Sequence, residues 1–320
     1  MQIFIDLFIK LLPLYFIIFL GYIAGKHLGV KRQSIAPLLI YIVVPIVNFK
    51  GVFEMEITPL TLTYPLYFFC VACILGLSFY SIGRASFRKK EEAALLSLTS
   101  TLANTGYFGI PLLLLLFGHD ILGPTVLIIF GLILYEYTLG FYLAAQGKYS
   151  PKDAFEKTIR LPVLYAVVAA LIANYFYNEH FLQMPTSTFT HIINTIIESL
   201  GIMMDKFVGA LTFLGMAMIG LGLASIEKIK FNFKFISLSL FSKFIIYPAF
   251  YFLFLFFNTK FDLYSTQVTQ IIFYMSFVPV GANCITLATQ LKLDTDDASI
   301  VIILSTVLSL VLIPLVASLH

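Results

Sequence analysis

The stretches STLANTGYFGIP (residues 100–111) and MSFVPVGAN (residues 275–283) place glycine, proline and asparagine inside runs that are otherwise apolar. These residue types favour turns and helix ends. In lipid, an interrupted helix persists only where protein or a water-filled cavity satisfies its freed backbone groups. A pair of such segments at corresponding positions of two halves points to the binding site of a transporter. We therefore expect a membrane protein whose ligand binds at these two breaks.

The composition predicts an integral membrane protein. The chain has 320 residues, of which 60% are hydrophobic and 12% are charged, against about 25% charged in ordinary soluble domains. A soluble fold of this size could not bury so much apolar surface. The formal net charge of +3 is small and spread over short loops, so no nucleic-acid partner is expected. We expect a multi-pass protein of the plasma membrane.

Ten segments are long and apolar enough to span a bilayer, which takes about 20 residues each. They cover residues 7–26, 34–53, 61–83, 92–117, 121–146, 160–178, 204–225, 234–257, 267–291 and 297–318. A weaker stretch at 186–203 reads as an amphipathic interfacial helix that leads into the seventh span. The fold class predicted is therefore all-α, with ten transmembrane helices.

The distribution of lysine and arginine orients these spans, because cytoplasmic loops carry an excess of both. The segments after the odd-numbered spans hold Lys26, Lys31, Arg32, Arg84, Arg88, Lys89, Lys90, Lys148, Lys152, Lys157, Arg160, Lys228, Lys230, Lys234 and Lys292. The alternate loops hold only Lys50 and Lys260. Both termini are therefore expected to face outward.

The short connection in the middle divides the chain into two sets of five spans. We expect a first repeat at 1–147, a cytoplasmic linker at 148–159 and a second repeat at 160–320. Because five is odd, the second set enters the membrane upside down relative to the first, which makes an inverted-topology repeat. The broken segments are the fourth member of each set.

The residues that interrupt or flank the breaks are the first candidates for substrate binding. They are Asn104, Gly106, Pro111, Pro279, Gly281 and Asn283, while Gly109 is expected to help interrupt the first segment. Each break exposes half-helix ends, with N-termini suited to an anion and C-termini suited to a cation. The asparagine amides can donate to a substrate oxygen. Alternatively, the prolines kink the helices for packing and the asparagines bond to the freed backbone.

Polar residues deep in other spans are further candidates, since burying them is costly. Lys243 could attract an anionic substrate or could snorkel to the membrane edge. Glu136 could bind a proton or coupling cation, or could make a structural hydrogen bond. Asn48 could line the cavity. Ser305 and Thr306 are expected to hydrogen-bond back to their own helix.

No motif of an enzyme is present. The sequence has no nucleophile elbow, no zincin motif and no phosphate-binding glycine loop. The histidines are scattered, without a metal-ligand spacing. We therefore expect no enzymatic activity, no metal site and no cofactor.

Several segments together resemble the auxin efflux carrier family of membrane transporters. Residues 104–111 are similar to its N-x-G-x-x-G-x-P signature, and residues 278–283 to its P-x-G-x-N motif. Residues 21–25, 41–45 and 303–310 with Pro314 resemble its first, second and last helices. The linker lacks the length found in plant carriers, which favours a compact, prokaryotic member. The family is distantly similar to the sodium–bile acid symporters.

The resemblance implies a ten-helix fold in which helices 4 and 9 cross at their breaks. Helices 1, 2, 6 and 7 would form a scaffold, and helices 3–5 and 8–10 a transport domain that moves in an elevator-like way. Substrates in the family are organic anions, including auxin and dicarboxylates. By this resemblance Asn104 and Asn283 would contact a carboxylate, and Pro111 and Pro279 would set the crossing. A homodimer is expected.

The function expected is secondary active or potential-driven transport of a small organic anion by alternating access, with substrate at the helix 4/helix 9 crossover. One alternative is a sodium-coupled organic-anion symporter of the bile-acid-symporter type. Another is a membrane ligand sensor that does not transport. The sequence is compatible with several anions, with either direction of flux, and with sodium, a proton or no coupling ion.

Overall fold

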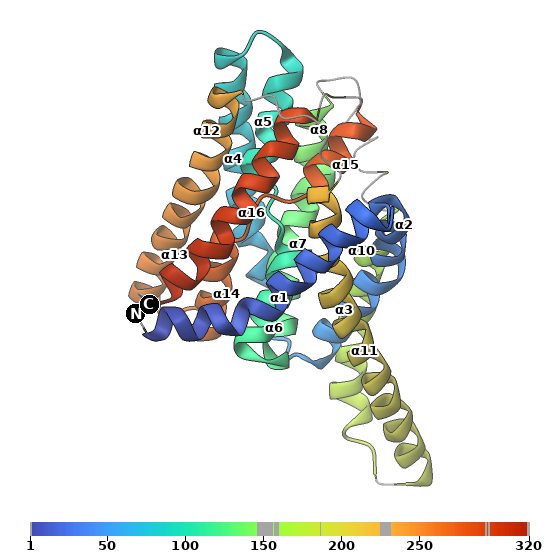
Figure 1. The fold of residues 1–320 in the computed structure, drawn as a ribbon. Helices are drawn as coiled ribbons and strands as arrows, with labels where there is room; N and C mark the ends of the chain where they lie inside the picture. Colours follow the sequence, from blue (N-terminus) through green and yellow to red (C-terminus); the bar gives the residue numbers. More distant parts are fainter. Residues whose placement is uncertain are drawn as a thin grey trace.

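The computed structural model describes residues 2–145, 156, 160–185, 187–224, 232–291, 293 and 295–318. Within these ranges the regular elements are helices, and the only extended pairing is an isolated antiparallel bridge between Ala103 and Val280. Figure 1 shows the helices packed into one bundle. The predicted linker at 148–159 lies outside the described residues except for position 156, as do Lys228, Lys230 and Lys292.

The first half of the chain forms five helical segments. They are α1 (Gln2–His27); α2 (Arg32–Leu38), η1 (Leu39–Val43) and α3 (Val44–Glu54); η2 (Thr61–Thr63) and α4 (Tyr64–Ser86); α5 (Lys90–Thr101), η3 (Thr105–Gly109) and α6 (Ile110–Phe117); and η4 (His119–Ile121), α7 (Leu122–Tyr135), η5 (Glu136–Gly140) and α8 (Phe141–Ala144).

The described part of the second half continues with further helices. They are α10 (Pro162–Phe176) with η6 (Tyr177–Phe181); α11 (Thr188–Ala224); α12 (Phe233–Phe241), η7 (Ser242–Ile246) and α13 (Tyr247–Phe261); α14 (Thr266–Phe277) and α15 (Asn283–Gln290); and α16 (Asp296–Ala317).

Three of the π-helical turns have a common sequence cause. η1, η3 and η7 each end two residues before a proline: Pro45, Pro111 and Pro248. Proline has no N–H to donate to the preceding turn and its ring crowds the carbonyl there. A single wider turn accommodates the missing bond and lets the helix continue. The turn η5, which begins at Glu136, has no proline after it.

Seven of the described helical segments are long and apolar enough to cross a membrane. They correspond to seven of the ten predicted spans. The other three predicted spans coincide with the broken segments α5–α6 and α14–α15 and with the shorter α10–η6. The all-helical membrane fold is thus confirmed, whereas ten crossings, the inverted repeat and the outward termini stay predictions.

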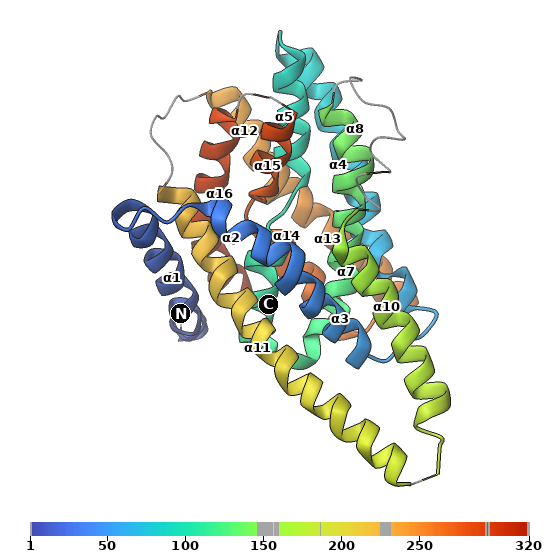
Figure 2. The same ribbon diagram turned by 90° about the vertical axis from the view of Figure 1, so that its right-hand side faces the viewer.

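The helix α11 differs from the sequence-based expectation. We expected an interfacial helix at 186–203 followed by a span beginning at 204, but the structure has one continuous helix of 37 residues. At 1.5 Å per residue it is about 55 Å long, well beyond a bilayer core of about 30 Å. No proline interrupts Thr188–Ala224, and the apolar residues Leu200, Ile202 and Met203 continue the helix through the expected boundary. Its N-terminal half extends beyond the bundle beside the end of α10 (Figure 2).

Two groups of helices pack mainly within themselves. In the first group α1 packs on α11, and α3 packs on α10 and α11. The axes of α1 and α11 approach closely, because a Cβ at Gly220 would lie 2.0 Å from the carbonyl oxygen of Ile18. Small residues permit such close crossings in membranes. In the second group α4 packs on α5 and α7, and α12 on α5 and α16.

Lys50 connects two helices of the first group. From the sequence Lys50 is predicted to lie in a loop, but it lies in α3 and is 6% exposed. Its Nζ is 2.5 Å from Oε1 of Glu54 and 3.3 Å from Oδ1 of Asp205 on α11. The buried charge is thereby paired on both sides.

Candidate functional site

The fourth helical segment is broken at Leu102–Asn104. Helix α5 ends at Thr101, Leu102 has extended backbone angles, and the π turn η3 begins at Thr105. The break thus lies before Gly106, Gly109 and Pro111, which we expected to interrupt the helix and which instead begin its second half. Pro111 lies in the first turn of α6, directly after η3, and the wider turn of η3 accommodates its missing N–H.

The ninth helical segment is broken at residues 278–282. Helix α14 ends at Phe277, Val278 is extended, and α15 begins at Asn283. Pro279 and Gly281 lie within this break, as predicted. Asn104 and Asn283 hold equivalent places, since each stands at the start of the half-helix that follows its break.

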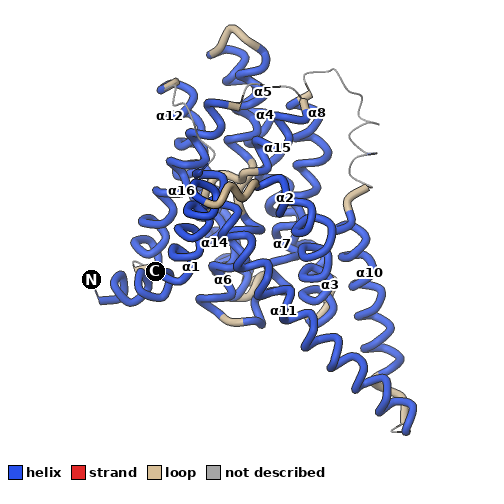
Figure 3. The backbone as a smooth tube through the Cα atoms, turned by 45° about the vertical axis from the view of Figure 1, so that its right-hand side comes forward, coloured by secondary structure: helices blue, strands red, loops and turns tan. Residues whose placement is uncertain are grey.

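The two breaks meet and satisfy one another's backbone groups near the centre of the bundle (Figure 3). The Asn104 N–H donates to the Pro279 carbonyl oxygen at 2.8 Å, and the Gly281 N–H donates to the Leu102 carbonyl oxygen at 2.8 Å. These two bonds flank the bridge between Ala103 and Val280. Interrupted helices inside a membrane need such partners.

Helix α16 supplies a further partner for the crossing. The Val280 N–H donates to the Ser305 hydroxyl at 3.0 Å, while Ser305 donates to the carbonyl oxygen of Ile302 at 3.0 Å. The expected bond from Ser305 to its own helix is therefore present. In addition, Ser305 accepts a bond from the second break. The Thr306 hydroxyl donates to the Ile302 carbonyl oxygen at 2.7 Å, as expected.

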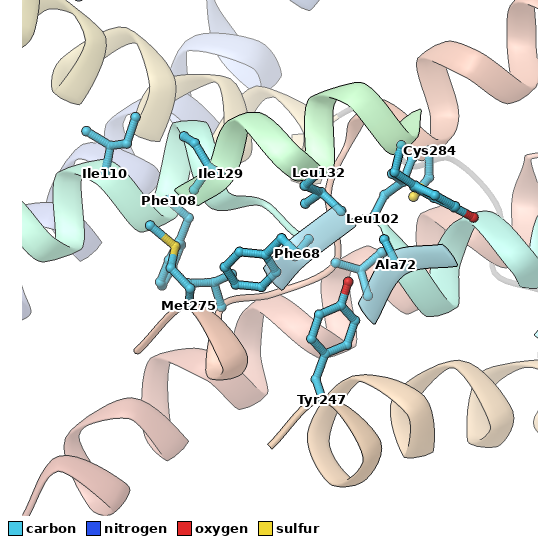
Figure 4. Close-up of a cluster of buried hydrophobic side chains, with 14 of the residues drawn as sticks. Phe68, Ala72, Leu102, Phe108, Ile110, Ile129, Leu132, Tyr247, Met275 and Cys284 are labelled. Atoms are coloured by element: carbon cyan, nitrogen blue, oxygen red, sulfur yellow. The ribbon is translucent and has the colours of Figure 1, made fainter. Parts of the chain in front are cut away.

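Apolar side chains pack against one side of the crossing (Figure 4). Leu102, Phe108 and Met275 are buried with Phe68 of α4 and Tyr247 of α13. The Tyr247 hydroxyl donates to the carbonyl oxygen of Thr101, the last residue of α5. The break is thus embedded in a packed core on one side.

On its other side the crossing borders a cavity of about 140 Å³. Its polar lining comes from Asn48, Asn104, Thr105, Tyr107, Glu136, Tyr137, Asn283 and Thr286. Apolar residues of η1, α3, α6, α7, α10, α11 and α15 complete the wall. The cavity therefore lies between the two groups of helices, with the crossing as its floor.

A carboxylate faces this cavity. Glu136 is 6% exposed and accepts a hydrogen bond of 3.2 Å, at Oε2, from Nδ2 of Asn283. Glu136 opens the π turn η5, and such turns are frequent at functional sites. Within the described part of the chain, no lysine or arginine lines the cavity to balance it.

Six of the predicted site residues meet at this cavity and three do not line it. Asn48, Asn104, Gly106, Gly281, Asn283 and Glu136 are in its lining. Pro111 is buried at the start of α6, Pro279 is buried within the second break, and Lys243 lies in η7. Their roles in substrate binding stay predictions.

Four polar residues of the lining were not predicted from the sequence: Thr105, Tyr107, Tyr137 and Thr286. Tyr107 and Tyr137 each follow a recognised candidate, Gly106 and Glu136, and lie in π turns that bring neighbouring side chains to one face. Thr286 lies three residues after Asn283 and so shares its face of α15. That spacing was a signal available in the sequence.

Asn48 is held by its own helix. Its Nδ2 donates to the Val44 carbonyl oxygen at 2.8 Å, and its Oδ1 is buried without a partner among the described residues. An unpaired buried acceptor in a cavity wall is available to a donor on a ligand.

Comparison with known proteins gives two family matches. Residues 6–160 match the membrane transport protein family, which includes the auxin efflux carriers, and residues 207–320 match the sodium–bile acid symporter family. Each match contains one of the two breaks. The resemblance inferred from the sequence is thereby confirmed.

A curated relative points the same way. An uncharacterized transporter of Methanocaldococcus jannaschii is 28% identical over 170 residues, which amount to 50% of this chain and 54% of the relative. The chain thus spans about half the length of the curated relative that it matches. Together with the apolar helices, these similarities identify a multi-pass membrane protein related to transporters.

Proposed function

We propose that the protein is a secondary transporter that carries a small organic anion, such as a carboxylate, across the plasma membrane by alternating access. The observation that carries the proposal is the crossing of two broken helices beside a polar cavity. Helix breaks that face one another at mid-bundle are typical of transporter binding sites.

The ends of the half-helices support an anionic substrate. The half-helices that start at η3 and α15 both begin at the cavity. Helix N-termini carry free N–H groups and partial positive charge. The amides of Asn104 and Asn283, which stand at these two starts, can donate further hydrogen bonds to a carboxylate.

Glu136 suggests the coupling ion. An ionised carboxylate in the same small cavity would repel an anionic substrate. Two carboxyl groups at close range can share one proton, which removes the repulsion. We therefore propose that substrate binds together with a proton on Glu136 and that the two cross the membrane together.

The packing of the helices supports an elevator-like division. The helices α1, α3, α10 and α11 would be the scaffold, and α4–α8 with α12–α16 would carry the crossing and move against it. In this proposal the chain crosses the membrane ten times as two inverted five-helix repeats, with both termini outside. The cavity between the two groups would open to alternate sides as the moving group shifts.

Sodium coupling is the second candidate. The match of residues 207–320 to the sodium–bile acid symporter family favours it. It predicts that transport depends on a sodium gradient, whereas proton coupling predicts dependence on a pH gradient. Flux measurements with one gradient at a time separate the two.

The test begins with a thermal-shift screen of purified protein against small carboxylates across pH. A ligand at 100 times its dissociation constant stabilises the folded state by about 2.7 kcal/mol. The best ligand is then labelled and its flux measured in proteoliposomes with wild type, Asn104→Ala and Asn283→Ala. We expect both variants to lose most of the flux. Wild-type rates in both would refute the assigned site, and conduction without saturation would refute a carrier.

A further inference from the structure

Lys243 is a buried cation that the cavity does not use. Its residue is 1% exposed, and it is absent from the cavity lining. Among the described residues its Nζ has no hydrogen-bond partner, and it lies over the ring of Tyr247 at 4.0 Å from the ring centroid. It is thus enclosed by protein instead of reaching the membrane edge. A source of negative potential stabilises the charged form of a lysine in such a place.

The end of α5 supplies that potential. Ser242, the residue before Lys243, donates from its hydroxyl to the Ser100 carbonyl oxygen at 2.9 Å. Tyr247, one turn later, donates to the Thr101 carbonyl oxygen. Lys243 therefore lies on the turn that caps the last residues of α5. The C-terminus of a helix carries partial negative charge and attracts cations.

Oxygen atoms of this helix end would also suit a metal ion. The hydroxyl of Ser100 is buried without a partner among the described residues. In transporters with broken helices, the C-terminal ends of half-helices hold the sodium ion or proton that drives transport. In this chain the Lys243 amino group lies over the ring of Tyr247, whose hydroxyl bonds to this helix end, and a positive charge there opposes a second cation.

We propose that the ammonium group of Lys243 is a built-in cation that takes the place of a coupling metal ion at the C-terminal end of α5. Sodium then has no site there in the wild-type protein, although residues 207–320, which include Lys243, match a sodium symporter family. Removing the lysine charge should create a site for sodium. The inference concerns the ion and not the cargo, so it does not depend on which substrate the protein carries.

The test compares thermal unfolding of the detergent-purified protein in sodium chloride and in choline chloride at equal concentration. The variants are Lys243→Ala, which removes the charge, and Lys243→Arg, which keeps it. Lys260→Ala is the matched control, because Lys260 lies on the neighbouring α13 but is exposed. We expect Lys243→Ala alone to unfold several degrees higher in sodium. Wild type, Lys243→Arg and Lys260→Ala should unfold at the same temperature in both salts.

Two results would overturn the inference. One is a sodium-specific rise in the wild type, which needs no variant to fold. The other is a Lys243→Ala protein that unfolds identically in both salts. Neither readout uses a substrate, so this outcome is independent of whether the proposed carboxylate transport is found.

Discussion

The carboxylate of Glu136 accepts a hydrogen bond of 3.2 Å from the amide of Asn283, the first residue of the half-helix α15. This contact joins an acid in η5 to one of the two broken helices. It also brings a proton-binding group to the place where a substrate anion is proposed to bind. A change in the protonation of Glu136 therefore changes its hydrogen bond with Asn283 at the crossing.

Replacing Glu136 by Gln keeps the shape of the side chain and a partner for Asn283 but removes the titratable proton. In the wild type, flux should fall as pH rises, by about tenfold per pH unit once the carboxyl is mostly ionised. The Glu136→Gln protein should transport at a rate that does not depend on pH, without accompanying proton movement. The measurement is labelled-substrate flux in proteoliposomes with a trapped pH dye.

The exposed Glu91 of α5 provides the control for this experiment. Glu91→Gln should retain the wild-type pH profile. If Glu136→Gln retains it as well, Glu136 is not the proton carrier.

Gly281 should be required for the close approach of the two breaks. A Cβ at this position would lie 3.1 Å from the Ala103 carbonyl oxygen, so in Gly281→Ala the two backbone segments must shift by a few tenths of an ångström. We expect a loss of about 1–3 kcal/mol of stability, seen as a lower unfolding temperature. Gly106→Ala is the control, because nothing lies within 4 Å of its Cβ position. Equal unfolding temperatures for the two variants would contradict this account.

The sequence allowed much of the site to be predicted, because glycine, proline and asparagine are informative inside apolar runs. Asn104 and Asn283 were found in this way, and Glu136 was found because a carboxylate is costly in lipid. The predicted position of the first helix break was wrong by several residues. Pro111 fits the start of a helix as well as its interruption, and sequence alone does not distinguish these.

The side of the cavity that α3 and α11 form could not be predicted. Its wall consists of ordinary apolar residues such as Val44 and Leu211, whose position depends on how the helices cross and not on their own chemistry. The direction in which the Lys243 side chain points could not be predicted either, because a lysine that reaches the membrane edge and one that points into the protein have similar sequence surroundings. The continuity of α11 was not predicted, because polar residues near its start indicated a boundary. In the structure the helix continues through that position.

Ser305 should stabilise the crossing through the Val280 N–H. Ser305→Ala leaves that buried donor without its partner, which costs about 1–3 kcal/mol. Thr306→Ala removes only a bond within α16 and should cost less. Hydrogen exchange at Val280 should rise in Ser305→Ala alone, and unchanged exchange in that variant would remove Ser305 from the support of the crossing.

The contact of α1 with α11 should depend on the absence of a side chain at one position. Because a Cβ at Gly220 would meet the Ile18 carbonyl oxygen at 2.0 Å, Gly220→Ala requires the two helices to separate and should cost several kcal/mol. Gly209 lies on the same helix with nothing within 4 Å of its Cβ position. Gly209→Ala should therefore gain up to about 1 kcal/mol from helix propensity. Thermal unfolding of the two variants in the same detergent should move in opposite directions, and a Gly220→Ala protein as stable as wild type would show that α1 and α11 do not pack at this distance.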